Sequence, residues 1–208
     1  MARIVKKSGE RKKDIVKVAR NLFKTKDYEK TTMQDVMDTL GIAKGTIYHY
    51  FKSKEELLEA VIEDIVEENI GKMRSVVKET KGSALQKMKK LIQTGSLAAE
   101  NKSILDYLHK PGNDAMHTRL LAAILIKQAP LYAELIQQGC SEGIFKTQAP
   151  LECAEFMLAA VQFLTDLGIH PWTQEDLVRR IHAFPNLIEQ LLQAPSGSFQ
   201  FLTKQLGD

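Results

Sequence analysis

The stretch that decides the fold is Thr32-Met33-Gln34-Asp35-Val36-Met37-Asp38-Thr39-Leu40-Gly41-Ile42-Ala43-Lys44-Gly45-Thr46-Ile47-Tyr48-His49-Tyr50-Phe51. It holds two short helix patterns joined by a tight turn. Thr32 can cap the first helix, with Asp35 at the capping-box position. Gly41 suits the left-handed residue that ends a helix. Apolar residues stand where two such helices pack together, so the spacing predicts a helix-turn-helix; these residues are Val36, Leu40, Ile42 and Ile47.

Outward from this stretch, apolar residues recur with a period near 3.6, and no segment alternates as a strand does. The chain therefore predicts an all-α fold. All six prolines lie beyond residue 110, so we expect a helix break near Pro130, a kink or a split of the last long helix at Pro185, and a loosely held tail after Pro195. Helices are expected at 10–25, 33–40, 44–51, 53–80, 84–99, 103–109, 114–128, 130–142, 150–168 and 174–193.

Charge is unevenly distributed along the 208 residues. Residues 1–55 contain 14 Lys and Arg against 7 Asp and Glu, a balance of +7, whereas residues 56–208 have a balance of −4. A basic segment on an acidic body suggests a polyanionic partner, although a solvated lysine-rich face would give the same count.

In a helix-turn-helix the second helix projects into the major groove of DNA. Here that helix offers mostly short or polar residues. Gly45 lets the backbone approach DNA closely, and Thr46 has a hydroxyl for a base edge and a methyl group for thymine. The pattern therefore favours a DNA-reading helix.

The segment is similar to the signature of the TetR family of transcriptional regulators. The resemblance extends from Phe23 through Thr31–Val36 to Gly41–Leu58. The chain departs from the family at Met37, where a small residue is usual. The resemblance implies phosphate contacts from Thr32, Lys44, Tyr48, His49 and Lys54, and base-edge positions for Thr46, Gly45 and Lys44. For Tyr48 the alternative to a phosphate contact is aromatic packing against the first helix. The same two roles, phosphate contact or packing, are open for Tyr50.

The resemblance also implies two domains: a three-helix DNA-binding domain at 1–53, and an effector-binding and dimerisation domain at 54–208. Small and large apolar residues alternate along 150–168 and 174–193, which could form a four-helix interface between two copies. An apolar stripe with a few polar tips could line an effector cavity, although such a stripe is usually packed core. Its members are Ile104, Tyr107, Leu108, His109, Met116, His117, Leu120, Ile124, Met157 and Phe163.

Catalytic motifs such as GxGxxG, a P-loop, GxSxG or HExxH are missing from the sequence, so no enzyme activity, cofactor or metal is expected. Cys140 and Cys153 do not have metal-ligand spacing and are expected to be reduced thiols. The longest uninterrupted apolar run, Leu120–Ile126, has seven residues, well short of the roughly 18 that a membrane helix needs. A cytoplasmic protein without a membrane partner is expected.

These observations together predict a homodimeric repressor of transcription that binds double-stranded DNA at a palindromic operator. An unidentified small and largely hydrophobic effector would release it. The alternative is a DNA-binding protein of the same fold that answers to a protein partner instead of a small ligand.

Overall fold

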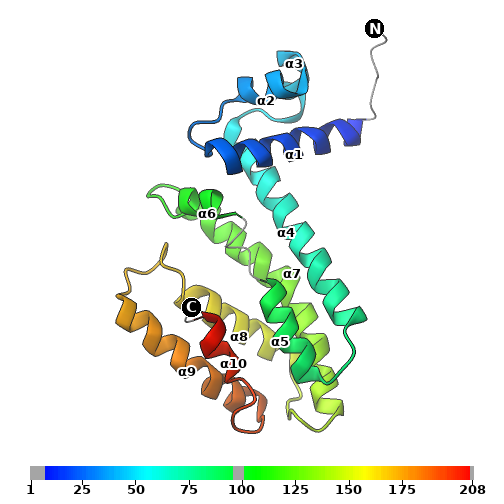
Figure 1. Ribbon diagram of the computed structural model, residues 1–208, viewed down its shortest axis with the longest axis vertical. Helices are drawn as coiled ribbons and strands as arrows, with labels where there is room; N and C mark the ends of the chain where they lie inside the picture. The colour runs from blue at the N-terminus through cyan, green and yellow to red at the C-terminus, as the bar shows by residue number, and fades with distance from the viewer. Residues whose placement is uncertain (1–7, 96–100, 207–208) are drawn as a thin grey trace. The chain divides into compact units, whose positions relative to one another are not determined.

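The computed structural model describes residues 8–95 and 101–206, which form two compact units. The first unit contains the chain up to Glu67 together with Leu97–Met116, and the second contains Glu68–Ser96 and His117–Asp208. Every regular element in the described ranges is a helix, as expected (Figure 1). The helices are α1 Ser8–Lys26, α2 Met33–Leu40, α3 Lys44–Tyr50, α4 Lys54–Glu79, α5 Ala84–Gly95, α6 Lys102–Leu108, α7 Asp114–Ser141, α8 Pro150–Leu164, α9 Gln174–Leu192 and α10 Phe201–Leu206.

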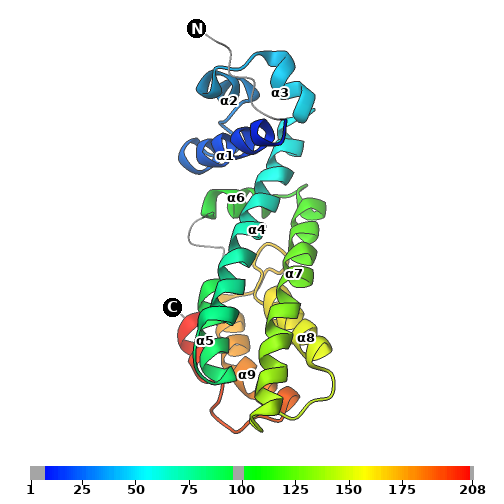
Figure 2. The same ribbon diagram turned by 90° about the vertical axis from the view of Figure 1, so that its right-hand side faces the viewer.

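In the first unit, α1 lies between two groups of helices. Both views place α2 and α3 on one side of α1 and α6 on the other (Figures 1 and 2). Its buried stripe runs along one face of the helix, and α3 and the start of α4 contribute further buried apolar residues to the same unit. Buried residues of this core are Ile15, Val16, Ala19, Phe23, Ile47, Phe51, Leu57, Leu58 and Val61.

The second unit packs the end of α4 with α5, α7, α8, α9 and α10. Its core is aliphatic, methionine-rich and aromatic; fully buried members include Met73, Met88, Leu91, Ile136 and Phe145. Pro150 stands in the first turn of α8, where its missing N–H costs nothing. The connection between α7 and α8 is attached to the end of α9 by a hydrogen bond of 2.9 Å from the Lys146 N–H to the Leu192 carbonyl.

The expected helix break at Pro130 is absent, and α9 is not split at Pro185. Each proline lies inside its helix, α7 or α9, which continues through it. A proline within a helix costs about 3 kcal/mol or more. Around Pro130 that cost is offset by burial of Ala129, Leu131 and Tyr132, and Pro185 is itself buried. Tertiary packing therefore overrides the local signal at both prolines.

The expectation of a loosely held tail is wrong. Phe199 is fully buried and its ring stacks on that of Phe145, with centroids 6.0 Å apart. The Phe199 N–H donates to the carboxylate of the buried Glu189 at 2.9 Å, and Leu202 of α10 is also buried. Burial of aromatic side chains holds this segment in place. Because the segment is not helical before residue 201, its sequence shows no helical periodicity there.

In the described ranges, one helix end differs from expectation by more than two residues. Helix α8 ends at Leu164 rather than residue 168, because the Asp166 carboxylate accepts the N–H groups of Gly168 and Ile169 in a turn. Helix α5 is described up to Gly95, and the remainder of the expected 84–99 helix lies outside the described residues. The domain boundary after residue 53 stays a prediction.

Helix α7 is long and apolar enough to cross a membrane by length and composition alone. The same helix supplies buried residues to the second unit, among them Leu120, Leu135 and Ile136. Because core helices pass this test too, it is weak evidence for a membrane span.

Candidate nucleic-acid interface

The start of α2 is fixed by the predicted capping box. The Thr32 hydroxyl accepts the Asp35 N–H at 3.1 Å, and the Asp35 carboxylate accepts the Thr32 N–H and hydroxyl, each at 2.7 Å. Lys26 donates to the same carboxylate at 2.8 Å. Hydrogen bonds from Lys26 and then Thr32 lower the pKa of Asp35 from 3.8 to about 2. The Asp35 carboxyl of the capping box is therefore ionised at neutral pH.

The turn and the buried face of α3 set the angle between the two helices. Gly41 ends α2 with φ +61°, the left-handed conformation expected for it. The Ile42 N–H then donates to the Met37 carbonyl at 3.1 Å. Val36, Met37 and Ile47 are all buried, so the larger Met37 is accommodated in the core. Both the cap and the turn are confirmed as the sequence predicts.

The opposite face of α3 faces solvent. Lys44, Gly45 and His49 are exposed, while Thr46 and Tyr48 are half-buried. A Cβ on Gly45 would meet open space, so close approach of a partner is unobstructed here. The Lys44 ammonium lies 5.8 Å from the centroid of the Tyr48 ring, which leaves a cationic and aromatic edge on the helix. This edge has the chemistry for phosphate and base contacts.

Two of the expected phosphate-binding residues already have partners inside the protein. Both donors of Thr32, its N–H and its hydroxyl, point to Asp35. The Lys54 ammonium donates to three backbone carbonyls, those of Tyr28 at 3.0 Å, Glu29 at 3.3 Å and Thr31 at 3.1 Å. The sequence did not indicate this arrangement, and DNA contacts by Thr32 and Lys54 stay predictions.

Tyr28 completes the arrangement around Lys54. The Lys54 ammonium lies 4.2 Å from the centroid of the Tyr28 ring, a cation–π contact. Tyr28 also packs edge-on against Phe23 and touches Tyr107 of α6, with centroids 5.0 and 4.1 Å away. Burial, reinforced by Tyr107 and Glu55, raises the pKa of Tyr28 above its ordinary range. The phenol is therefore neutral and acts in packing.

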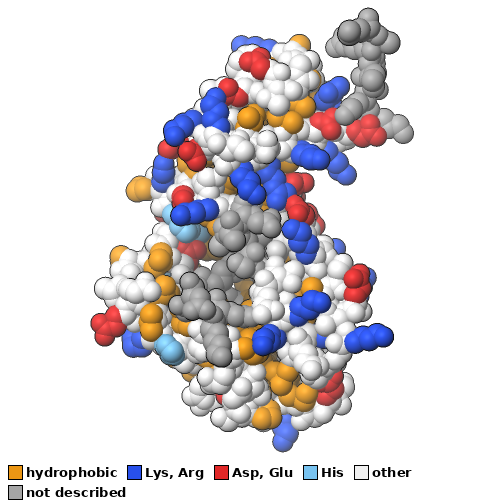
Figure 3. Space-filling model, viewed as in Figure 1, with side chains coloured by type: hydrophobic (Ala, Val, Ile, Leu, Met, Phe, Trp, Pro, Cys, Tyr) orange, Lys and Arg blue, Asp and Glu red, His pale blue; other side chains and the backbone are white. Residues whose placement is uncertain are grey.

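The charge of the first unit is locally balanced. Lys26 pairs with Asp35, Lys30 with Asp27, and Arg20 with Asp64, at 2.8 to 3.4 Å. Figure 3 shows acidic side chains beside basic ones on the visible face of this unit. The basic balance in the sequence therefore does not produce a uniformly basic surface on that face.

The ten residues of the expected effector stripe divide between the two units. In the first unit, Ile104 and Leu108 are buried, Tyr107 and Met116 are half-buried, and His109 is exposed. In the second unit, His117, Leu120 and Met157 are buried, Ile124 is half-buried, and Phe163 is 49% exposed. The buried aliphatic members are in ordinary core positions, and an effector contact from any of the ten stays a prediction.

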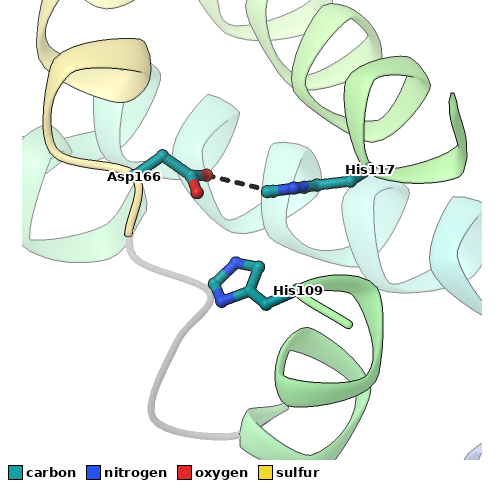
Figure 4. A group of neighbouring side chains, drawn as sticks. All are labelled: His109, His117 and Asp166. Carbon is teal, nitrogen blue, oxygen red and sulfur yellow. Dashed lines mark ion pairs between the residues drawn. The ribbon is translucent and has the colours of Figure 1, made fainter. Parts of the chain in front are cut away.

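His117 belongs to a polar contact inside the second unit. Its Nε2 lies 3.0 Å from the Asp166 carboxylate, and both side chains are nearly enclosed (Figure 4). Because Asp166 also accepts the N–H groups of Gly168 and Ile169, the pair connects α7 to the turn after α8. This contact gives His117 a structural partner.

The second unit has a hollow of about 260 Å³ between α7 and α8. Its wall is almost wholly apolar, and of the expected effector residues it includes Phe163. The lining residues are Thr118, Leu121, Ala122, Leu125, Ala159, Gln162, Phe163 and Ile169.

An exposed apolar stripe continues from this hollow along α8. Phe156 is 67% exposed, and it shares a helix face with Ala159 and Phe163. On α7, Ile126 is exposed as well. Exposed apolar patches are a feature of surfaces that bind other molecules.

Comparison with known proteins agrees with this architecture. Residues 15–61 match the family model described as bacterial regulatory proteins of the tetR family, and residues 96–187 match a tetracyclin repressor-like C-terminal domain. The uncharacterized HTH-type transcriptional regulator YfiR of Bacillus subtilis is 29% identical over 170 residues, which cover 71% of this chain and 75% of YfiR.

The HTH-type transcriptional repressor KstR2 of Mycolicibacterium smegmatis is 26% identical over 145 residues, covering 65% of this chain and 68% of KstR2. A TetR-family transcriptional regulator from Pectobacterium atrosepticum has the same fold, with a TM-score of 0.67 at 20% identity over 91% of this chain and all of that one. The helix-turn-helix geometry and the matches to both parts of the chain lead to one conclusion: this protein belongs to the TetR family of DNA-binding transcriptional regulators.

Proposed function

We propose that the protein is a homodimeric repressor that binds a palindromic operator and is released from it by a small, largely hydrophobic effector. The observation that carries the proposal is the solvent-exposed face of α3, with Lys44, Gly45 and His49 open and Ile47 anchored in the core. The relative KstR2 is described as a transcriptional repressor, which supports repression as the function of this protein.

Dimerisation is supported by the exposed apolar stripe on α8. A single helix-turn-helix binds DNA weakly, and a two-fold dimer presents two of them to successive major grooves. We propose that residues 150–168 and 174–193 form the interface, with Phe156 and Phe163 at its centre.

Effector release is supported by the apolar character of the second unit, which includes the hollow beside Phe163. An effector can shift the regulator off DNA only if it binds the non-binding conformer more tightly. The ligand would be mainly apolar, because a charged group buried among these side chains would lack a partner.

DNA recognition is tested by selecting duplexes from a randomised pool with the full-length protein and measuring the affinity of Thr46→Ala for the selected and unselected duplexes. If Thr46 reaches a base edge, the gap between the two affinities narrows by about 1–3 kcal/mol. Thr39→Ala, on the exposed side of α2, is the matched control and should leave the gap unchanged. A pool that shows no enrichment of a two-fold sequence would refute operator binding.

The effector is tested by a thermal-shift screen of apolar, aromatic and charged compounds, because a ligand that binds the folded state raises the melting temperature. Stabilising compounds are then tested for release of the selected duplex. Stabilisation by charged compounds alone would contradict the proposed pocket chemistry.

A further inference from the structure

The environment of Lys54 differs from that of the other expected DNA contacts. Its ammonium has three N–H donors, and three carbonyl oxygens of the α1–α2 connection lie within 3.3 Å of it. The Tyr28 ring covers a further side at 4.2 Å. The ammonium therefore has its full number of hydrogen bonds before any DNA is present.

The three carbonyls belong to Tyr28, Glu29 and Thr31, in the segment that leads directly into α2. This segment is unusual in conformation, since Asp27 adopts φ +66°, a left-handed value that costs energy for a residue other than glycine. Three carbonyl dipoles that converge on one point repel each other unless a cation lies between them. Lys54 supplies that cation from the first turn of α4.

The end of the same segment fixes the first residue of the helix-turn-helix. The Thr31 hydroxyl donates to the Asp27 carbonyl at 2.7 Å, and its N–H reaches the Tyr28 carbonyl at 3.1 Å. Thr32 then caps α2. The path from Lys54 to the start of α2 thus consists of short, directional bonds.

We propose that Lys54 is a positioning residue: its ammonium organises the α1–α2 connection, and so the start of α2, and it makes no phosphate contact when the protein binds DNA. This inference rests on the DNA-binding function proposed above. It reassigns a lysine whose place in the motif suggests a phosphate ligand.

The two roles differ in their dependence on salt. A phosphate contact releases counterions, so losing it reduces the slope of log K against log salt by about 0.9 per contact. A positioning lysine lowers affinity at all salt concentrations and leaves the slope unchanged. They also differ in tolerance of arginine, which can replace lysine at a phosphate but does not fit a cradle of three carbonyls around one ammonium.

The experiment compares full-length wild type with Lys54→Met, Lys54→Arg and the control Lys44→Met, on a labelled duplex of mixed sequence across a salt series. Both Lys54 variants are expected to bind about tenfold more weakly, a change of about 1.4 kcal/mol, with the wild-type slope. Lys44→Met is expected to reduce the slope. Hydrogen exchange without DNA should accelerate at residues 27–36 in both Lys54 variants and stay unchanged in the control.

The proposal is overturned if Lys54→Met reduces the slope by about 0.9 per protomer while exchange at 27–36 is unchanged, or if Lys54→Arg binds and exchanges like wild type. Should Lys54→Met fail to fold, Lys54→Arg still decides between the two roles. If the wild type binds neither this duplex nor any duplex selected from the randomised pool, the proposed function fails. The exchange data would then still report whether Lys54 orders the α1–α2 connection.

Discussion

The exposed stripe on α8 makes a quantitative prediction for Phe156→Ser. A phenylalanine side chain offers roughly 150–250 Å² of surface, and 67% of Phe156 is exposed, so on the order of 130 Å² is available for burial. At about 25 cal/mol per Å², complete burial is worth about 3 kcal/mol per protomer. A two-fold interface buries the Phe156 side chain of each protomer, so the two together contribute about 6 kcal/mol. This corresponds to about 10⁴-fold in the dimer dissociation constant.

The assay is sedimentation velocity over a dilution series, with circular dichroism to confirm that the helices remain. Wild type should sediment as a dimer, and Phe156→Ser as a monomer at concentrations where wild type is fully associated. Glu155→Ser is the matched control, because Glu155 is exposed on the same helix but has a charged side chain that gains nothing from apolar burial. If Phe156→Ser remains as tightly dimeric as Glu155→Ser, the interface does not use this face and the reasoning is refuted.

Three further predictions concern the two units separately. The pKa of the Asp35 carboxyl should be near 2 by NMR titration and should move toward 3.8 in Lys26→Met. Because the pKa is lowered in the folded state, the contribution of this carboxylate to folding stability is complete above about pH 4 and is lost as the pH falls through 2. A pKa that does not move in Lys26→Met would contradict the assigned cause. Gly139→Ala should destabilise the second unit by about 1–2 kcal/mol in urea unfolding, because the new methyl overlaps the buried Phe145 ring and overpacking outweighs the gain in helix propensity. His117→Leu should cost about 1–3 kcal/mol by leaving a buried carboxylate without one of its partners, and His117→Gln, which retains a donor, should cost less; equal losses would argue against the hydrogen bond.

The parts of the interface that depend on local sequence could be predicted. The capping box at Thr32, the left-handed Gly41 and the burial of Ile47 each follow from residue type and spacing within a few positions. The buried face of α1 depends less on local sequence. Val16 is buried and the equally apolar Val18 is half-buried, because the neighbouring helices determine which edge of an apolar face is covered.

The cradle around Lys54 could not be predicted, because it depends on the path of the connection that includes Asp27. The left-handed residue in that connection is Asp27, and aspartate adopts this conformation only occasionally, so its presence in the sequence does not predict the path of the chain. The continuous helix through Pro130 was missed for the related reason that long-range burial outweighs a local breaker. Features fixed by distant contacts are those that sequence patterns describe least well.

The salt dependence of DNA binding depends on which lysine side chains can exchange their present partners in the protein for DNA phosphates. The +7 balance of residues 1–55 counts every lysine equally, but their environments differ. Lys26 and Lys30 pair with carboxylates at the surface, and such pairs are worth so little that a phosphate can replace the partner at small cost. Lys54 would have to abandon three carbonyls and an aromatic ring. The number of counterions released should therefore reflect residues such as Lys44 and exclude Lys54, so net charge alone overstates the electrostatic contribution to binding.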